Sequence, residues 1–429
     1  MFGFANFLLL ALFAAAVFDL IFALARGGGL RGALHGLWNT PHLLFGQQLA
    51  EWRLQLGRIL FAAGLAAYEI SVVFCNSMAR QNWAWVQGVM SPVLEWLAFL
   101  CFGAKILFGT RYTWRELLTG GALYFIARWV YFNSQNIWWI GIVVAVLAAK
   151  DIPLRRPLQV YFASGCAAMA VVLALHFAGI VAPDLTSERM GALRGTYGYG
   201  HPNTFGGLVF GLVLAYALLR AQKVRWVDCL LVFAVGVFLL VGPASRSAAL
   251  CTLALAVGLV FCRLRVGHSV PRWWPGTCAG MVGLTAAVSY LLPLLVIKVG
   301  PWNNDIGPAW LAKLDSLLTC RISLTWMAYR LLDVKIAGQV FNWPTVDNSF
   351  AFALFQFGPV VAALLGILFA AALWGHAKQG RRVEVCCLFA MLAYAYMEVQ
   401  PFHLTTNPTV LLLCGAVFAQ TSTRWQKIE

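Results

Sequence analysis

Long apolar runs separated by short polar segments make up most of the 429 residues, of which 61% are hydrophobic and 11% are charged. Many of these runs are about 17 to 25 residues long, the length at which an α-helix crosses a bilayer. Soluble proteins carry about 25% charged residues, so the composition excludes a soluble core. The pattern predicts an all-α protein, a polytopic transmembrane helix bundle. Because no long polar linker interrupts it, we expect residues 1–429 to form a single integral membrane domain.

Basic residues gather in seven clusters between the apolar runs: Arg26/Arg31/Arg53/Arg58, Lys105/Arg111/Arg115, Lys150/Arg155/Arg156, Arg220/Lys223/Arg225, Arg263/Arg265/Arg272, Lys378/Arg381/Arg382 and Arg424/Lys427. If every cluster lies inside, as the positive-inside rule requires, an even number of spans must separate successive clusters. Thirteen spans satisfy this condition, with the N-terminus outside and the C-terminus inside. Twelve remain if residues 3–25 do not cross. The rule also accounts for the net charge of +15, so we expect a lipid bilayer and no nucleic acid as partner.

Four unusual polar segments then fall on the predicted outer face. They are 195–207 (GTYGYGHPNTFGG), 242–247 (GPASRS), the long loop at about 299–347, and 400–403 (QPFH). The long loop contains LDSLLTCRI (314–322), whose leucines have helical spacing, so we expect this loop to be partly helical. Loops of more than about 15 residues in a compact protein are usually functional.

Three arginines lie in or beside these segments, namely Arg194, Arg246 and Arg321. Arginine is costly to desolvate near a membrane, and its planar guanidinium suits bidentate contacts with phosphate. Several arginines converging at the outer surface would suit a lipid-linked diphosphate. For any one of them, contact with a lipid headgroup or an ion pair with an acidic residue such as Asp315 is the simpler interpretation.

Candidate proton acceptors are few on this face. His201 and His403 are the histidines placed outside, and Glu398 lies at the outer end of an apolar span, where an ionisable residue is a functional candidate by default. Asn203 follows His201-Pro202 and has two interpretations. It either contacts a ligand or caps the helix that starts at Thr204.

Further polar and aromatic residues mark the same face. Asp347 and Asn348 precede an apolar span and are candidates for a helix cap or for substrate binding. Tyr197 and Tyr199 alternate with glycines, a pattern that could form an aromatic platform for sugars. The outer segments contain no Walker motif, no paired Asp-x-Asp and no GxGxxG, so we expect no cofactor and no metal, and an activated substrate must supply the energy.

In order along the chain, several segments together resemble one family. They are Ala149-Lys150-Asp151-Ile152, Arg194 followed by YGYGHPN (197–203), Ser245-Arg246-Ser247, LDSLLTCRI (314–322), Asp347-Asn348-Ser349-Phe350, and Glu398 with Asn407. Over residues 145–410 the chain resembles the bacterial polysaccharide polymerases of the O-antigen ligase/polymerase superfamily, especially capsular and exopolysaccharide polymerases. The family often has glycine at the position of Cys320.

The resemblance implies a GT-C-type membrane glycosyltransferase in the bacterial cytoplasmic membrane, with its active site facing outside. Its substrate would be an undecaprenyl-diphosphate-linked oligosaccharide, and it would polymerise repeat units by metal-independent, inverting transfer. A flippase and a chain-length regulator are further partners that it implies. The binding residues would be Arg194, Arg246, Arg321, Asn203, Tyr199, Asp347, Asn348 and His403.

The catalytic base is Glu398 or His201, and we favour Glu398. The related ligases carry an essential histidine in the large outer loop, whereas residues 299–347 contain none, so that residue has no counterpart here.

Two alternatives to a polymerase stay open. A ligase that transfers the finished polymer to another acceptor differs only in the acceptor. A flippase or transporter of lipid-linked oligosaccharide usually shows inverted repeats or broken helices at corresponding positions in two halves, which are not evident in the sequence.

Overall fold

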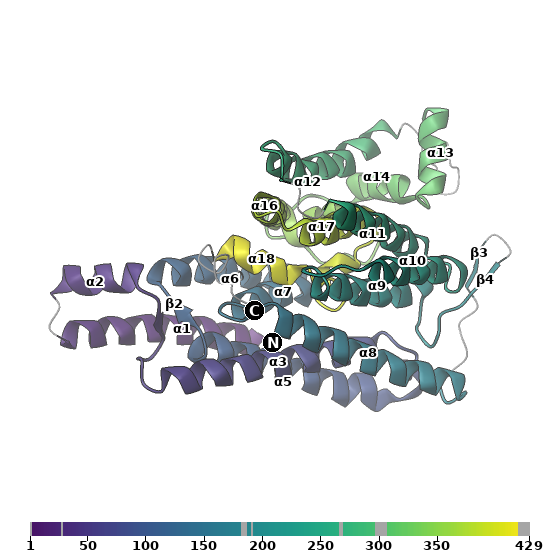
Figure 1. The fold of residues 1–429 in the computed structure, drawn as a ribbon. Helices are drawn as coiled ribbons and strands as arrows, with labels where there is room; N and C mark the ends of the chain where they lie inside the picture. Colours follow the sequence, from purple (N-terminus) through teal and green to yellow (C-terminus); the bar gives the residue numbers. More distant parts are fainter. Residues whose placement is uncertain are drawn as a thin grey trace.

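The computed structural model describes residues 2–26, 29–181, 187–189, 192–265, 269–296 and 307–418. Most of these residues are helical (Figure 1). Within the described part of the chain, strands form two small antiparallel pairs. One joins β1 (His42–Leu43) to β2 (Arg111–Tyr112), and the other joins β3 (Ser187–Arg189) to β4 (Ala192–Arg194).

The helices are, in chain order, α1 (Phe2–Ala25), α2 (Leu30–Asn39), α3 (Ala50–Cys75), α4 (Ala79–Asn82), η1 (Val86–Met90), α5 (Ser91–Phe108), α6 (Trp114–Ser134), α7 (Ile137–Ala148), α8 (Arg155–Phe177), α9 (Pro202–Leu219), α10 (Trp226–Val241), α11 (Arg246–Leu264), α12 (Trp274–Leu291), η2 (Leu292–Leu295), α13 (Ala309–Leu317), α14 (Arg321–Leu331), α15 (Ser349–Phe352), η3 (Ala353–Phe357), α16 (Gly358–Lys378), α17 (Arg382–Met397), η4 (Gln400–Phe402) and α18 (Val410–Val417). Two of them, α13 and α14, lie in the long loop predicted at 299–347.

Eight helical segments among the described residues are long and apolar enough to cross a membrane: α1, α3, η1–α5, α8, α9, α11, α12–η2 and α15–η3–α16. The prediction of an all-helical membrane protein is confirmed at this level. The other five predicted spans correspond to α6, α7, α10, α17 and α18, which are shorter or, in the case of α6, less apolar. The count of twelve or thirteen spans, and their orientation, stay predictions.

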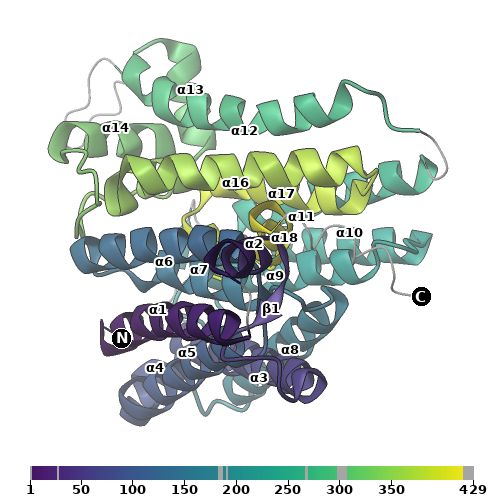
Figure 2. The same ribbon diagram turned by 90° about the vertical axis from the view of Figure 1, so that its left-hand side faces the viewer.

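The helices form layers that both views show (Figures 1 and 2). Helices α1, α3, α5 and α8 lie on one side, and α12, α13 and α14 lie on the opposite side. Between them, α7 is the most enclosed helix, because every residue from Trp139 to Ala148 is buried. A helix that is apolar on all sides belongs in a core of this kind.

The outer surfaces of peripheral helices remain apolar and exposed. On α1 and α10 the exposed large side chains include Phe7, Leu10, Phe13, Ile21, Val227, Leu230, Phe233 and Val241. Continuous apolar faces of this extent would be unfavourable in water. They indicate a lipid bilayer as the surroundings of the bundle.

Helices α9, α11 and α17 pack against one another and decide where the polar segments meet. At one end of this trio α9 and α11 begin and α17 ends, so the loops carrying 195–201, 242–245 and 398–403 are neighbours. The contact depends on two glycines. A methyl group at Gly206 would collide with Ser245, and one at Gly207 would collide with the side chain of Gln400.

Candidate functional site

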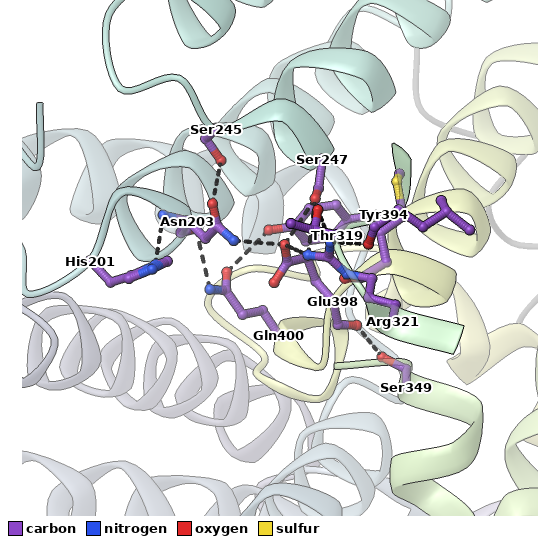
Figure 3. Close-up of polar contacts among 12 residues, drawn as sticks. His201, Asn203, Ser245, Ser247, Thr319, Arg321, Ser349, Tyr394, Glu398 and Gln400 are labelled. Atoms are coloured by element: carbon purple, nitrogen blue, oxygen red, sulfur yellow. Dashed lines mark hydrogen bonds and ion pairs between the residues drawn. The ribbon is translucent and has the colours of Figure 1, made fainter. Parts of the chain in front are cut away.

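Glu398 lies at the centre of a buried polar cluster at the end of the bundle that the charge pattern places outside (Figure 3). Its side chain is 7% exposed. One carboxylate oxygen, Oε1, accepts three hydrogen bonds, from Asn203 Nδ2 at 2.9 Å, Ser247 Oγ at 2.9 Å and Arg321 Nη2 at 2.6 Å. We call Arg194, Asn203, Ser247, Arg321 and Glu398 the Glu398 cluster. Its members come from β4, α9, α11, α14 and the chain after α17.

The backbone around Glu398 places the carboxylate at the helix end. Helix α17 ends at Met397, and Glu398 has an extended backbone with φ −144° and ψ 150°. Its carbonyl oxygen accepts a hydrogen bond from Ser349 Oγ at 2.5 Å. Pro401 follows in the short helix η4, and a proline at this point favours a chain that leaves the helix. Hydrogen bonds to the side chain and to the backbone of Glu398 therefore both fix its position.

Arg321 is saturated by the protein. A guanidinium has five N–H donors. Here Nε donates to the carbonyl of Met397, and the two terminal nitrogens donate to Leu318 O (2.8 Å), Thr319 Oγ1 (2.9 Å), Ser247 Oγ (3.4 Å) and Glu398 Oε1 (2.6 Å). The expected bidentate contact with a diphosphate does not fit these hydrogen bonds. Arg321 instead orients Glu398 and neutralises its charge.

The segment LDSLLTCRI forms the turn that presents Arg321. Asp315 Oδ1 accepts hydrogen bonds from the N–H groups of Ile322 (2.7 Å) and Ser323 (3.2 Å) and so caps α14. Asp315 is therefore a capping residue rather than the ion-pair partner of an arginine. Cys320, where the resembling family often has glycine, has φ +63°, a region that glycine enters most easily.

Asn203 connects Arg194 to Glu398. Its side-chain oxygen accepts a hydrogen bond from Arg194 Nη2 at 3.1 Å, and its side-chain nitrogen donates to Glu398. Arg194, whose side chain is buried, also donates to the carbonyl of Ala244 at 3.2 Å. Neither interpretation of Asn203 included these two side-chain partners within the cluster.

The prediction that Asn203 caps the helix is wrong. Helix α9 begins at Pro202, and the residue before it, His201, is the N-cap, since its Nδ1 accepts a hydrogen bond from Asn203 N at 3.1 Å. Proline favours the first helical position because its φ angle suits the helix and it needs no hydrogen-bond acceptor. His201 is exposed and contacts the cluster through this backbone N–H.

Other predicted site residues lie apart from these hydrogen bonds. Asn348 caps α15, with its Oδ1 accepting from Phe350 N and Ala351 N. The His403 ring packs 3.9 Å from that of Trp138. Tyr199 is completely buried. Its ring therefore offers no surface to a sugar, contrary to the predicted aromatic platform. Arg246 is exposed at the first residue of α11, next to Ser247 in the chain.

The surroundings of Glu398 suit a proton acceptor. Burial raises the pKa of the Glu398 carboxyl to about 7; the Arg321 charge opposes this rise, the Asp347 charge adds to it, and the hydrogen bond from Ser247 opposes it. An ordinary glutamate titrates at about 4.3. A pKa close to neutral lets the group accept and release a proton at physiological pH.

Three residues of this site were not predicted: Ser247, Ser349 and Gln400. Ser247 and Ser349 donate to Glu398, and Gln400 Nε2 donates to the carbonyl of Asn203 at 3.2 Å. Each lies within a polar segment already singled out, beside Arg246, Asn348 or Pro401. Their position in those segments was the available signal, but serine and glutamine are too common in loops to be chosen without the contacts.

No family model, curated protein or solved structure matches this chain. A function for this chain must therefore be inferred from its residues and their geometry.

Proposed function

We propose that this protein is a membrane glycosyltransferase that polymerises undecaprenyl-diphosphate-linked oligosaccharide repeat units into a surface polysaccharide. The reaction would take place at the outer face of the bacterial cytoplasmic membrane, in a fold of the GT-C type. The proposal combines the resemblance of residues 145–410 with the arrangement of the Glu398 cluster.

One observation carries the proposal most directly. Five segments separated by long stretches of apolar helix meet in the Glu398 cluster, and four of its five residues were chosen from sequence: Arg194, Asn203, Arg321 and Glu398. A buried, paired charge at a helix end is expensive, and replacing such a pair by apolar residues often stabilises a protein. Its presence at this place favours a role in chemistry.

Glu398 is the general base in the proposed mechanism. Its Oε1 is occupied by three donors, whereas its Oε2 receives no hydrogen bond from any described residue. Oε2 would accept the proton of a sugar hydroxyl on the incoming repeat unit. That hydroxyl oxygen would form a bond with the anomeric carbon of the growing chain. The bond from this carbon to the lipid diphosphate would break, and the diphosphate would leave with the electron pair. Attack from the opposite face inverts the anomeric configuration.

Two arginines other than Arg321 would stabilise the leaving diphosphate, namely Arg194 and Arg246. Arg246 is exposed next to Ser247, and Arg194 belongs to the Glu398 cluster through its hydrogen bond to Asn203. A positive charge aimed at the leaving group is often worth several kcal/mol in the transition state, on the order of 3 per well-placed donor. Arg321 would act through Glu398, as a positioning residue.

An apolar pocket next to the cluster suits a lipid-linked substrate. Ser349, which donates to Glu398, also lines a pocket with Tyr290, Phe350, Leu365 and Phe369. Polar and apolar binding surfaces are therefore adjacent. A substrate with a charged head and an isoprenoid tail has the same combination.

Replacing Glu398 with glutamine tests the proposal. Glu398→Gln keeps the shape of the side chain but removes the basic oxygen, so we expect polymer formation from purified lipid-linked repeat units to fall about 10²- to 10⁴-fold. The matched control is Glu51→Gln, an exposed glutamate at the start of α3, which should retain the wild-type rate.

Normal polymer formation by Glu398→Gln, at normal protein level, would overturn the assignment of the base. The products also separate the polymerase from a ligase. A ladder of repeat units on the lipid carrier requires a polymerase, while a ligase moves a preformed polymer to a different acceptor and leaves its length unchanged.

A further inference from the structure

A second polar feature lies at the other end of the helices that build the Glu398 cluster. It is a cavity of ≈ 720 Å³ between the start of α8, the ends of α9 and α11, the α9–α10 connection and the start of α17. Helices α9, α11 and α17 thus carry the Glu398 cluster at one end and this cavity at the other. Since α9 has 18 residues, the two features are on the order of 27 Å apart along its axis.

Basic side chains dominate the lining of this cavity, which we call the basic cavity. Its cations are Arg155, Arg220, Lys223, Arg263, Arg381 and Arg382. Two are held by the protein, since Arg220 pairs with Asp228 at 3.1 Å and Arg382 donates to the carbonyl of Arg265. The other four, Arg155, Lys223, Arg263 and Arg381, form no ion pair with a described residue.

Acidic groups do not balance these cations. Glu384 is the carboxylate in the lining, and Asp228, which pairs with Arg220, is the acid next to it. The positive-inside rule accounts for basic residues in loops on this side of a membrane. It does not require that cations from four separate segments line one cavity, where a bound anion would reduce their mutual repulsion.

The backbone adds positive potential to the same space. Helices α8 and α17 both start at the basic cavity, and neither N-cap residue, Leu154 or Arg381, makes a capping side-chain hydrogen bond. The N–H groups of a first helical turn point toward such a space and favour anions. The backbone N–H groups therefore add to the positive potential that the arginine and lysine side chains create in the cavity.

The rest of the lining limits the class of ligand. Leu154, Leu158, Leu218, Leu219 and Val224 form an apolar part beside the arginines. The volume falls in the range of small-molecule sites, roughly 300 to 1,000 Å³. Arginine forks match phosphate oxygens bidentately. A phosphate group attached to a less polar portion therefore fits better than a simple halide or a carboxylate metabolite.

We propose that the basic cavity binds a phosphate-bearing anion, at the end of the bundle opposite to the Glu398 cluster. The phosphate contacts Arg155 and Arg381 at the two helix starts, with Lys223 and Arg263 at the rim. The ligand is either an anionic phospholipid headgroup or a soluble phosphate compound. This site is independent of the proposed glycosyl transfer, because it contains none of the residues of the Glu398 cluster.

The experiment measures binding by the full-length protein in nanodiscs. In neutral phosphatidylcholine, inorganic pyrophosphate is titrated while the thermal unfolding midpoint is followed, since a ligand that binds the folded state raises it. In discs with graded phosphatidylglycerol, native mass spectrometry counts retained anionic lipid. Binding of pyrophosphate in neutral discs indicates a soluble ligand, and retention of phosphatidylglycerol alone indicates a headgroup. Either result supports the proposal.

Charge-matched double variants separate the basic cavity from general surface charge. Arg155→Gln/Arg381→Gln removes two cavity arginines, whereas Arg31→Gln/Arg115→Gln removes two exposed arginines outside it. We expect the first variant to weaken binding about tenfold or more and the second to change it less than about twofold. If the first variant fails to fold, Lys223→Gln and a salt titration of the wild-type protein replace it. We expect each of them to lower the affinity for the phosphate ligand. Absence of binding in both discs, or equal loss in both double variants, would overturn the proposal.

Discussion

At the scale of single residues, the site depends on how hydrogen-bond donors are distributed over one carboxylate. Oε1 of Glu398 carries three donors, and Arg321 has no N–H left for a ligand. This division of roles separates an orienting arginine from the exposed Arg246. The two were equivalent candidates when judged by residue type.

The pH dependence of the reaction follows from Glu398. Desolvation raises its pKa to about 7, and a general base must be ionised, so the rate of polymer formation should rise with pH through about 7 and level off above it. Ser247→Ala removes a donor that favours the ionised form, so its midpoint should move to higher pH. The measurement is the initial rate against pH for both proteins. A Ser247→Ala profile with an unchanged midpoint would contradict the assigned role.

At the scale of helices, the site depends on the close approach of α9 to α11 and to the loop after α17. Gly206 and Gly207 permit this approach, because neither has a side chain to separate the helices. The glycines of GTYGYGHPNTFGG therefore divide into two groups. Those before His201 belong to the loop, and those after Asn203 belong to a helix contact.

Adding one methyl group at this contact should be costly. Gly206→Ala is expected to destabilise the protein by about 1 to 3 kcal/mol through overpacking against Ser245. The control is Gly280→Ala on α12, where a methyl group has no neighbour within 4 Å. That variant should be neutral or slightly more stable. Thermal unfolding of the two proteins in the same detergent makes the comparison, and equal midpoints would argue against a tight contact at Gly206.

At the scale of the whole molecule, Arg321 joins the layer of α12–α14 to the rest of the bundle. Helix α14 begins at Arg321, whose hydrogen bonds reach Ser247 on α11, Met397 at the end of α17 and Glu398 just after it (Figure 3). The ion pair is buried on both sides, with exposed fractions of 8% and 7%. The catalytic and architectural roles of this arginine are therefore linked.

Removing one partner of this pair should destabilise the protein more than removing both. Arg321→Met leaves Glu398 without its buried counter-charge and is expected to cost about 3 to 5 kcal/mol. Adding Glu398→Gln to the same protein should recover part of that loss. Arg330→Met, at an exposed position on the same helix, should cost less than about 1 kcal/mol. The free energies of unfolding of the wild type, Arg321→Met, Glu398→Gln and the double variant give the coupling energy between Arg321 and Glu398. A coupling energy near zero would contradict a tight pair.

The sequence by itself determined the helical membrane class, the approximate positions of the helices and the polar segments that contain the site. These features follow from the length of apolar runs and from where charges interrupt them, which are local properties of the chain. Each of the thirteen predicted spans overlaps a helix, and among the described residues eight helical segments are long and apolar enough to cross a membrane.

Only the tertiary structure decided which polar side chains meet. Asn203, Ser247 and Arg321 lie 195, 151 and 77 residues from Glu398 in sequence, yet all three donate to one oxygen. Whether Asn203 caps its helix or contacts a carboxylate depends on the packing of α9 against α11 and α17. The basic cavity has the same origin, because its cations are spread over four segments and form one site only where the helix ends meet.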